Sequence, residues 1–402
     1  MANTVDRERL VETFIELAKI PSPSDHEERV SSFIQDYLQA LGIESSADDA
    51  GNLLVFVPGA LPADPIMLCG HMDTVDRDPQ TPVPVIRDGD TIRTDGTRIL
   101  GADNKDNLAA ILEATRVVVA SDTPHRPFEL VFTTGEEKIS KGAKRFDCSR
   151  LASRRGIISD GPRPYGVVTV SAPGHYDFRG VIHGLTSHSA YSNKGINALT
   201  YFMRFMQELA QRGIRLGFQD AEGSEALNFN VVHAGHVFPP VTPYAEILDG
   251  SWNSVPELVE FRGELRGKDR EALVAKVALI QAAFAAATDE LRAAYDALKT
   301  ERVLPASSLV ATCNADPYLI EENGSFVQAV MSVLRDQGVT PEVHHALGGS
   351  DANVFSAYLG HPVETVLISG PSIDNHQPDE ATDIPELVRL AEFYTTVLTS
   401  NI

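Results

Sequence analysis

Cysteine and basic residues are both scarce in this sequence. Its 402 residues include three cysteines, and 34 Lys and Arg residues stand against 56 Asp and Glu, for a net charge of −22 at pH 7. Three cysteines without a close pair provide neither a disulfide framework nor a zinc knuckle, so we expect a reducing, cytoplasmic setting. The negative charge argues against nucleic acid or an anionic membrane as the main partner.

Long apolar runs are also absent. No stretch reaches the roughly 18 apolar residues of a membrane-spanning helix, and the N-terminus has no apolar signal segment. The composition, with 43% hydrophobic and 22% charged residues, is ordinary for a soluble globular protein. At roughly 150 residues per domain, the length predicts two or three domains.

Strand and helix patterns alternate in both terminal parts of the chain, as in 53–57 (strand), 107–120 (helix) and 128–133 (strand). This alternation predicts an α/β fold with a mostly parallel sheet flanked by helices. The central part instead has the order strand, helix, strand, strand, helix, which is typical of a small α+β domain. We therefore predict an α/β domain interrupted by an inserted α+β domain. The α/β domain comprises 1–172 and 317–402, and the insertion comprises 173–316.

Polar residues cluster just beyond the C-terminal ends of the predicted strands. In open α/β sheets this edge is where ligands bind. A further carboxylate, Asp103, precedes the predicted helix and can reach the same edge. The clusters contain His71 and Asp73, Glu136 and Glu137, Asp160, and His376.

Two histidines and several carboxylates at one edge predict a metal site. Mixed nitrogen and oxygen ligands suit Zn²⁺, with Co²⁺ or Mn²⁺ as substitutes. A single catalytic zinc needs three protein ligands, and more candidates are present, so we predict two metal ions bridged by one carboxylate. Glu136 is then free to act as the general base, and Asp73 to accept the second ring N–H of His71. The five ligand candidates are His71, Asp103, Glu137, Asp160 and His376.

As a set, the polar motifs resemble those of the dinuclear zinc exopeptidases, a family that includes peptidase T, carboxypeptidase G, aminoacylase and succinyl-diaminopimelate desuccinylase. The motifs occur in the family's order and cover nearly the whole chain. Two of them, 194–198 and 349–353, are most similar to the peptidase T branch. The matching runs are 70–75, 101–105, 135–137, 159–161, 187–190 and 348–352, followed by His376 with Glu380.

The resemblance implies a role for each ligand. His71 and Asp160 would hold one zinc ion, Glu137 and His376 the other, and Asp103 would bridge them. It also implies a cis peptide bond after Asp103.

The resemblance further implies a homodimer in which the inserted domain serves as a lid and dimerisation domain. His188 of that domain would reach into the partner's site and stabilise the oxyanion. Asn253 and Arg266 of the same domain would bind polar groups of the substrate. Gly349 and Ser350 belong to a loop that would line the substrate site.

The sequence departs from the family's pattern at several positions. Asp106 and Asn107 stand where a small residue and a glycine are usual, and Ile139 stands where a glycine is usual. Residues 189–192 differ from the usual motif after His188, and the segment 236–248 is longer than expected. None of these departures removes a predicted ligand, but those in the inserted domain leave the substrate open.

The sequence therefore predicts a zinc-dependent hydrolase of peptide or other amide bonds in small substrates, with exopeptidase action on short peptides as the leading hypothesis. An N-acyl amino acid amidohydrolase or a carboxypeptidase of the same family is the alternative. A non-catalytic relative that binds metal or peptide is a third hypothesis. A serine hydrolase or a nucleotide-dependent enzyme is disfavoured, because the sequence has no nucleophile elbow, P-loop or dinucleotide-binding motif.

Overall fold

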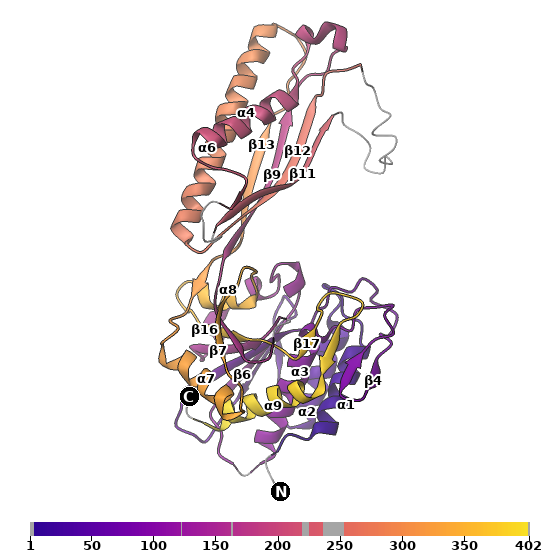
Figure 1. Ribbon diagram of the computed structural model, residues 1–402, viewed down its shortest axis with the longest axis vertical. Helices are drawn as coiled ribbons and strands as arrows, with labels where there is room; N and C mark the ends of the chain where they lie inside the picture. Colours follow the sequence, from indigo (N-terminus) through magenta and orange to yellow (C-terminus); the bar gives the residue numbers. More distant parts are fainter. Residues whose placement is uncertain (1–3, 122, 162–163, 219–224, 236–252, 401–402) are drawn as a thin grey trace. The chain divides into compact units, whose positions relative to one another are not determined.

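The computed structural model describes residues 4–121, 123–161, 164–218, 225–235 and 253–400. The chain divides into two compact units, and the predicted long segment 236–248 lies outside the described residues. Unit 1 comprises Met1–Ala172 and Tyr318–Ile402, and unit 2 comprises Pro173–Pro317. In Figure 1, the indigo and purple first part of the chain and the orange and yellow last part lie together in unit 1.

Unit 1 is built on a nine-stranded sheet in the order β1-β2-β6-β3-β7-β16-β8-β14, with β15 also paired to β8. The four central strands β6, β3, β7 and β16 are parallel, and β2 and β8 flank them in the antiparallel direction. The predicted α/β class is confirmed. The strands are β1 (Ser46–Ala47), β2 (Leu53–Val57), β6 (Phe128–Thr133), β3 (Ile66–His71), β7 (Arg155–Ser159), β16 (Glu364–Ile368), β8 (Val167–Ala172), β14 (Tyr318–Leu319) and β15 (Glu342–His345).

Helices cover this sheet and enclose the larger hydrophobic core. Every residue of β3 and β6 is buried, as expected for central strands that are covered on both faces. Helix α3 packs against β3 and also contacts α1 and α9. The helices of unit 1 are α1 (Arg7–Lys19), α2 (Glu28–Ala40), α3 (Ala102–Val119), α7 (Ser325–Asp336), α8 (Asp351–Ala357) and α9 (Ile384–Thr399), with short 3₁₀ turns η1 (Glu136–Lys138), η2 (Ala143–Arg145) and η3 (Cys148–Arg150).

A small antiparallel sheet in the order β17-β18-β5-β4 joins two distant parts of unit 1. It anchors both ends of the loop that carries His376, because β17 precedes that residue and β18 follows it. The strands are β4 (Ile86–Asp88), β5 (Thr91–Arg93), β17 (Ser372–Ile373) and β18 (Ala381–Asp383).

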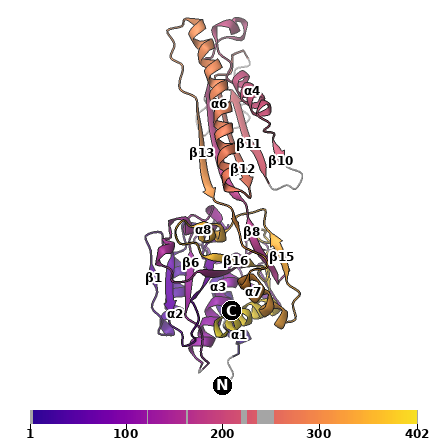
Figure 2. The same cartoon turned by 90° about the vertical axis from the view of Figure 1, so that its left-hand side faces the viewer.

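Unit 2 is an antiparallel sheet in the order β10-β11-β12-β9-β13, with helices α4 and α6 along one face (Figures 1 and 2). Its core is rich in aromatic side chains, and Phe205 of α4 contacts the rings of Phe229, Phe261 and Phe284. Its elements are β9 (Gly174–His183), η4 (Ser189–Lys194), α4 (Ala198–Gln211), β10 (Gly217–Phe218), β11 (Ala226–Gly235), β12 (Leu258–Gly267), α6 (Arg270–Leu298) and β13 (Ser308–Ala315).

Helix α6 is long and apolar enough to cross a membrane by length and composition alone. One side of it, however, is buried in the core of unit 2, where Ile280, Phe284 and Leu291 pack with the sheet. Asp269 caps its N-terminus by accepting a hydrogen bond from the backbone N–H of Ala272 at 2.7 Å. Packing within unit 2 therefore explains the apolar residues on this buried side of α6.

Candidate metal centre

The parallel strands of unit 1 end at the same edge and deliver polar side chains to it. β3 ends at His71, which lies opposite Thr133 at the end of β6. β7 ends at Ser159, directly before Asp160. Gly135 lies two residues beyond β6, and its φ of +59° belongs to the left-handed region that glycine adopts easily. That turn directs Glu136 and Glu137 back to the same edge.

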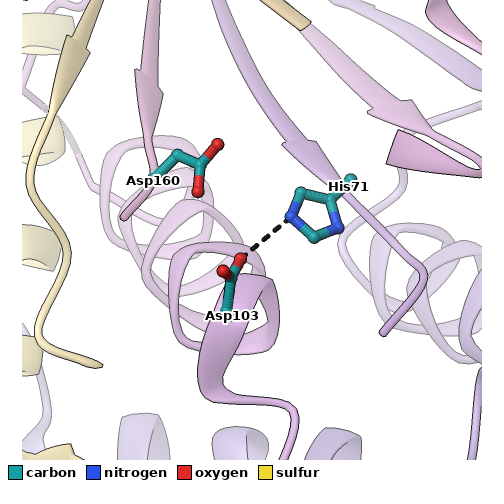
Figure 3. A group of neighbouring side chains, drawn as sticks. All are labelled: His71, Asp103 and Asp160. Atoms are coloured by element: carbon teal, nitrogen blue, oxygen red, sulfur yellow. Dashed lines mark hydrogen bonds and ion pairs between the residues drawn. The ribbon is translucent and has the colours of Figure 1, made fainter. Parts of the chain in front are cut away.

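His71, Asp103 and Asp160 form the first group of potential ligands, drawn in Figure 3. One ligand atom from each lies within 4.8 Å of the others. The imidazole Nε2 of His71 is 3.0 Å from Asp103 Oδ1. Asp103 lies at the start of α3, where it and Asn104 have non-helical backbone angles, and the peptide bond between them is cis.

Asp103, Glu137 and His376 form a second group within the same 4.8 Å limit. His376 Nε2 lies 2.8 Å from Glu137 Oε1 and 3.3 Å from Asp103 Oδ2. Asp103 thus has one carboxylate oxygen in each group. His376 has φ +66°, a backbone conformation that is uncommon for residues other than glycine and clusters at functional sites.

Asp73 is fully buried and connects His71 to the Glu136–Glu137 turn. Its Oδ1 lies 3.3 Å from His71 Nδ1 and accepts the backbone N–H of Glu136 at 2.9 Å. Its Oδ2 accepts the backbone N–H of Glu137 at 3.1 Å and the hydroxyl of Ser24 at 2.7 Å. Asp73 therefore fixes the His71 ring and the Glu136–Glu137 turn together.

The ionisable groups at this edge perturb one another strongly. Burial and the nearby charge of Asp103 raise the pKa of Asp160 to about 8. Hydrogen bonds to Asp103 and Glu137 raise the pKa of His376 to about 10. Burial also holds the pKa of Glu136 well above its usual range. Groups with such displaced pKa values are typical of functional sites.

A cavity of about 450 Å³ opens onto these side chains. The carboxylates of Asp103, Glu136, Glu137 and Asp160 line it, and so does His376. Its described lining contains neither lysine nor arginine. The loop with Gly349 and Ser350 forms part of the wall, and the Ser350 side chain caps α8 by accepting from Ala352 N–H at 3.2 Å.

The donor chemistry fits a pair of divalent ions. The two groups offer imidazole nitrogens and carboxylate oxygens, the mixture that zinc accepts, and they share one carboxylate that can bridge. A third combination, His71 with Glu136 and Glu137, also satisfies the 4.8 Å limit. The two groups that share Asp103 use all five predicted ligands and leave Glu136 over.

The family model described as "Peptidase family M20/M25/M40" matches residues 67–400. The chain belongs to this peptidase family. M20 enzymes are metal-dependent hydrolases of peptide bonds, so the predicted family and reaction class are confirmed.

Individual relatives agree with the M20 assignment. The uncharacterised protein YqjE of Bacillus subtilis (strain 168) is 29% identical over 404 residues, which cover 98% of each chain. Peptidase T of Vibrio cholerae serotype O1 (strain ATCC 39541) is 26% identical over 69% of this chain and 60% of its own length. The crystal structure of the aminopeptidase PepT from Bacillus cereus ATCC 10987 aligns over 98% of both chains with a TM-score of 0.82 and 26% identity.

The other site residues predicted from M20 motifs lie in unit 2. His188 is exposed at the start of η4, and its Nδ1 accepts the backbone N–H of Ala190 at 3.1 Å. The backbone of Asn253 is beside it, because its carbonyl accepts the N–H of Ser189 at 2.8 Å. Arg266 on β12 forms an ion pair with Glu264 at 3.2 Å.

Two residues that contact Asp103 were not assigned a role from the sequence. Asn375 donates its side-chain amide to Asp103 Oδ2 at 2.8 Å, and Glu380 accepts the backbone N–H groups of Gly101 and Asp103 at 2.6 and 3.3 Å. Glu380 belongs to a recognised motif, so a signal existed for it. Asn375 directly precedes His376 but has no recognisable spacing of its own.

Proposed function

We propose that this chain is a dinuclear zinc exopeptidase that removes the N-terminal residue from short peptides. The observation that carries the proposal is the pair of ligand groups sharing Asp103 at the edge of a cavity, with Glu136 beside them. In the proposed site, His71 and Asp160 hold one ion, and Glu137 and His376 hold the other. Co²⁺ or Mn²⁺ can substitute for Zn²⁺ in such a ligand set.

The protein's own groups carry the proton transfers. When bound, the two ions would polarise the scissile carbonyl and lower the pKa of the attacking water. Glu136 accepts a proton from that water as the water oxygen attacks the carbonyl carbon. The carbon–nitrogen bond then breaks, and Glu136 gives the proton to the departing amine nitrogen. Hydrogen bonds from the turn to Asp73 keep the Glu136 backbone in place.

The lining of the cavity favours N-terminal cleavage. A carboxypeptidase must bind the substrate's terminal carboxylate close to the scissile bond, usually with arginine or lysine. The described wall in unit 1 offers four carboxylates and no such cation. The similarity to the aminopeptidase PepT over 98% of the chain supports the same choice.

His188, Asn253 and Arg266 complete the proposal in unit 2. Because Nδ1 of His188 accepts a backbone hydrogen bond, the neutral ring carries its proton on Nε2 and can donate it to an oxyanion. We propose that this donor acts on the site of a second copy, in a homodimer, while Asn253 and Arg266 bind polar groups of the substrate. A cytoplasmic location is part of the same proposal, supported by the similarity to a cytosol non-specific dipeptidase of Escherichia coli.

A mass-spectrometric screen of matched peptides tests the activity. Each tripeptide is offered with a free N-terminus, with an N-acetyl group or with a C-terminal amide, to zinc-loaded enzyme and to Glu136→Gln as the blank. We expect release of the first residue from the free and amidated peptides and no cleavage of the acetylated one. Release of the C-terminal residue, or hydrolysis of N-acyl amino acids, would assign the enzyme to the alternative class. A metal-loaded protein that cleaves nothing would identify a non-catalytic relative.

A further inference from the structure

A chain of buried hydrogen bonds runs beneath the first ligand group. The hydroxyl of Tyr394 donates to Asn107 Oδ1 at 2.7 Å. Asn107 Nδ2 donates to the carbonyl of Cys69 at 2.9 Å and to Asn104 Oδ1 at 2.8 Å. Asn104 Nδ2 in turn donates to the carbonyl of Ser159 at 2.7 Å. All five residues are buried, so each bond is sheltered from competing water.

This chain of hydrogen bonds joins four separate elements. Three of them carry a predicted metal ligand at or next to the point where they meet. Tyr394 lies on α9, Asn107 and Asn104 on α3, and the two accepting carbonyls on β3 and β7. Three of its members stand one or two residues from a ligand of the same group. These pairs are Cys69 with His71, Asn104 with Asp103, and Ser159 with Asp160.

The fit between α3 and β3 at this point is tight. A Cβ atom added to Gly70 would lie 2.7 Å from Asn107 Nδ2 and 2.8 Å from Asn104 Oδ1. The two amide side chains therefore press against bare backbone of β3, between the bonded carbonyl of Cys69 and the ligand His71. A larger or reoriented Asn107 side chain would therefore displace the start of α3 or the end of β3.

We propose that Asn107 and Tyr394 are positioning residues that set the spacing of His71, Asp103 and Asp160 and thereby the metal affinity of that group. This inference rests on the proposed dinuclear function. Metal binding requires ligand distances within about 0.2 Å of the preferred values, and groups that orient ligands typically contribute 10–100-fold to affinity. Among the described residues, the chain of bonds reaches neither Glu137 nor His376, the two ligands that belong to the second group alone.

The test measures metal binding in the absence of peptide. In a His376→Ala background only the first group keeps its full set of ligands, and titration of metal-free protein with Zn²⁺ against a competing chelator reports its affinity. Tyr394→Phe leaves Asn107 Oδ1 without its donor. Asn107→Asp keeps that acceptor but replaces the amide N–H groups with an oxygen that faces two other oxygens. We expect both changes to weaken this affinity about 10–100-fold.

Tyr165→Phe is the matched control. Its buried hydroxyl also donates to α9, at the carbonyl of Arg389 (3.2 Å), and to the side chain of Gln337 (3.0 Å). We expect this variant to lose thermal stability comparable to that of Tyr394→Phe while its zinc affinity stays within about threefold of the parent. Should Asn107→Asp fail to fold, the two phenylalanine variants still decide the matter.

Unchanged zinc affinity in folded Tyr394→Phe would overturn the inference, as would an equal loss in Tyr165→Phe. The proposed function is judged separately by peptide cleavage in the parent enzyme. Normal cleavage with unchanged affinity in Tyr394→Phe refutes only the positioning role. If the parent protein cleaves no peptide, but zinc affinity falls in Tyr394→Phe and not in Tyr165→Phe, only the proposed activity is refuted.

Discussion

The two units bury very different side chains. Unit 1 encloses carboxylates and amides such as Asp73, Asp106, Asn107 and Glu380. In the described part of unit 2, every buried side chain is apolar. Burying a polar group costs free energy unless its partners are present, so an interior without such groups is the simpler route to stability. In unit 1, Asp73 and Glu380 accept hydrogen bonds from the backbone beside predicted ligands, whereas the buried interior of the described part of unit 2 is packed from apolar side chains.

Glu136→Gln should have the largest effect. It tests whether the polar site of unit 1 carries out the proposed proton transfer. The amide keeps the size of the side chain but cannot accept a proton from water. We expect kcat for a tripeptide to fall by about 10²–10⁴-fold. Zinc content by mass spectrometry and the melting temperature should stay close to those of the parent. Full turnover in the variant would remove Glu136 from the mechanism.

Phe205→Ala tests how much the apolar interior of unit 2 contributes to stability. Phe205 is fully buried among other aromatic rings of unit 2, and its truncation leaves a cavity. We expect a loss of about 3–5 kcal/mol in the free energy of unfolding, measured with urea. Because all five predicted ligands belong to unit 1, zinc affinity below the melting transition should be retained. A parallel loss of zinc affinity would show that the two interiors are not independent.

The pH dependence of metal binding probes unit 1 again. In the metal-free protein Asp160 has a pKa of about 8 and His376 of about 10, so both hold a proton at pH 7. Each must lose its proton to bind a metal ion, and lower pH therefore favours the metal-free form. We expect affinity to weaken at least about tenfold from pH 7 to pH 6. Calorimetry of zinc binding in buffers of different ionisation enthalpy will count the protons released. A count of zero would contradict the predicted deprotonation of Asp160 and His376.

Ile139→Gly should have the smallest effect. Ile139 follows the Glu136–Glu137 turn with φ +63°, which a β-branched residue adopts only under strain. Glycine removes the strain but adds freedom to the unfolded chain, so we expect a gain of at most about 1 kcal/mol in unfolding free energy. Thermal denaturation measures it. A lower melting temperature would mean that contacts of the isoleucine outweigh the backbone strain.

The sequence was informative where the pattern is local. The segments 53–57 and 128–133 were predicted as strands with the bounds that β2 and β6 have. The location of His71, Glu137 and Asp160 at or just beyond strand ends followed from the same alternation. Residues 308–315, by contrast, were not recognised as a strand, because β13 is largely exposed and lacks a strong apolar pattern.

Contacts over long sequence distances could not be predicted in this way. Nothing near Asn107 indicates that Tyr394 donates to it, because α3 and α9 meet only after the chain has closed the sheet. The antiparallel pairing of β8 with β16 could not be predicted from local sequence patterns either. The family motifs supplied His376 as a ligand candidate, whereas Asn375 at its side required the folded geometry.

The strand order β7-β16-β8 constrains how the protein can be made. A ribosome releases β7 and β8 early and β16 only after the whole of unit 2, because synthesis proceeds from the N-terminus. Until then both early strands carry an unpaired edge, the feature through which nascent chains aggregate. His376 emerges later still, so a chain that stops before it would lack a predicted ligand of the second group.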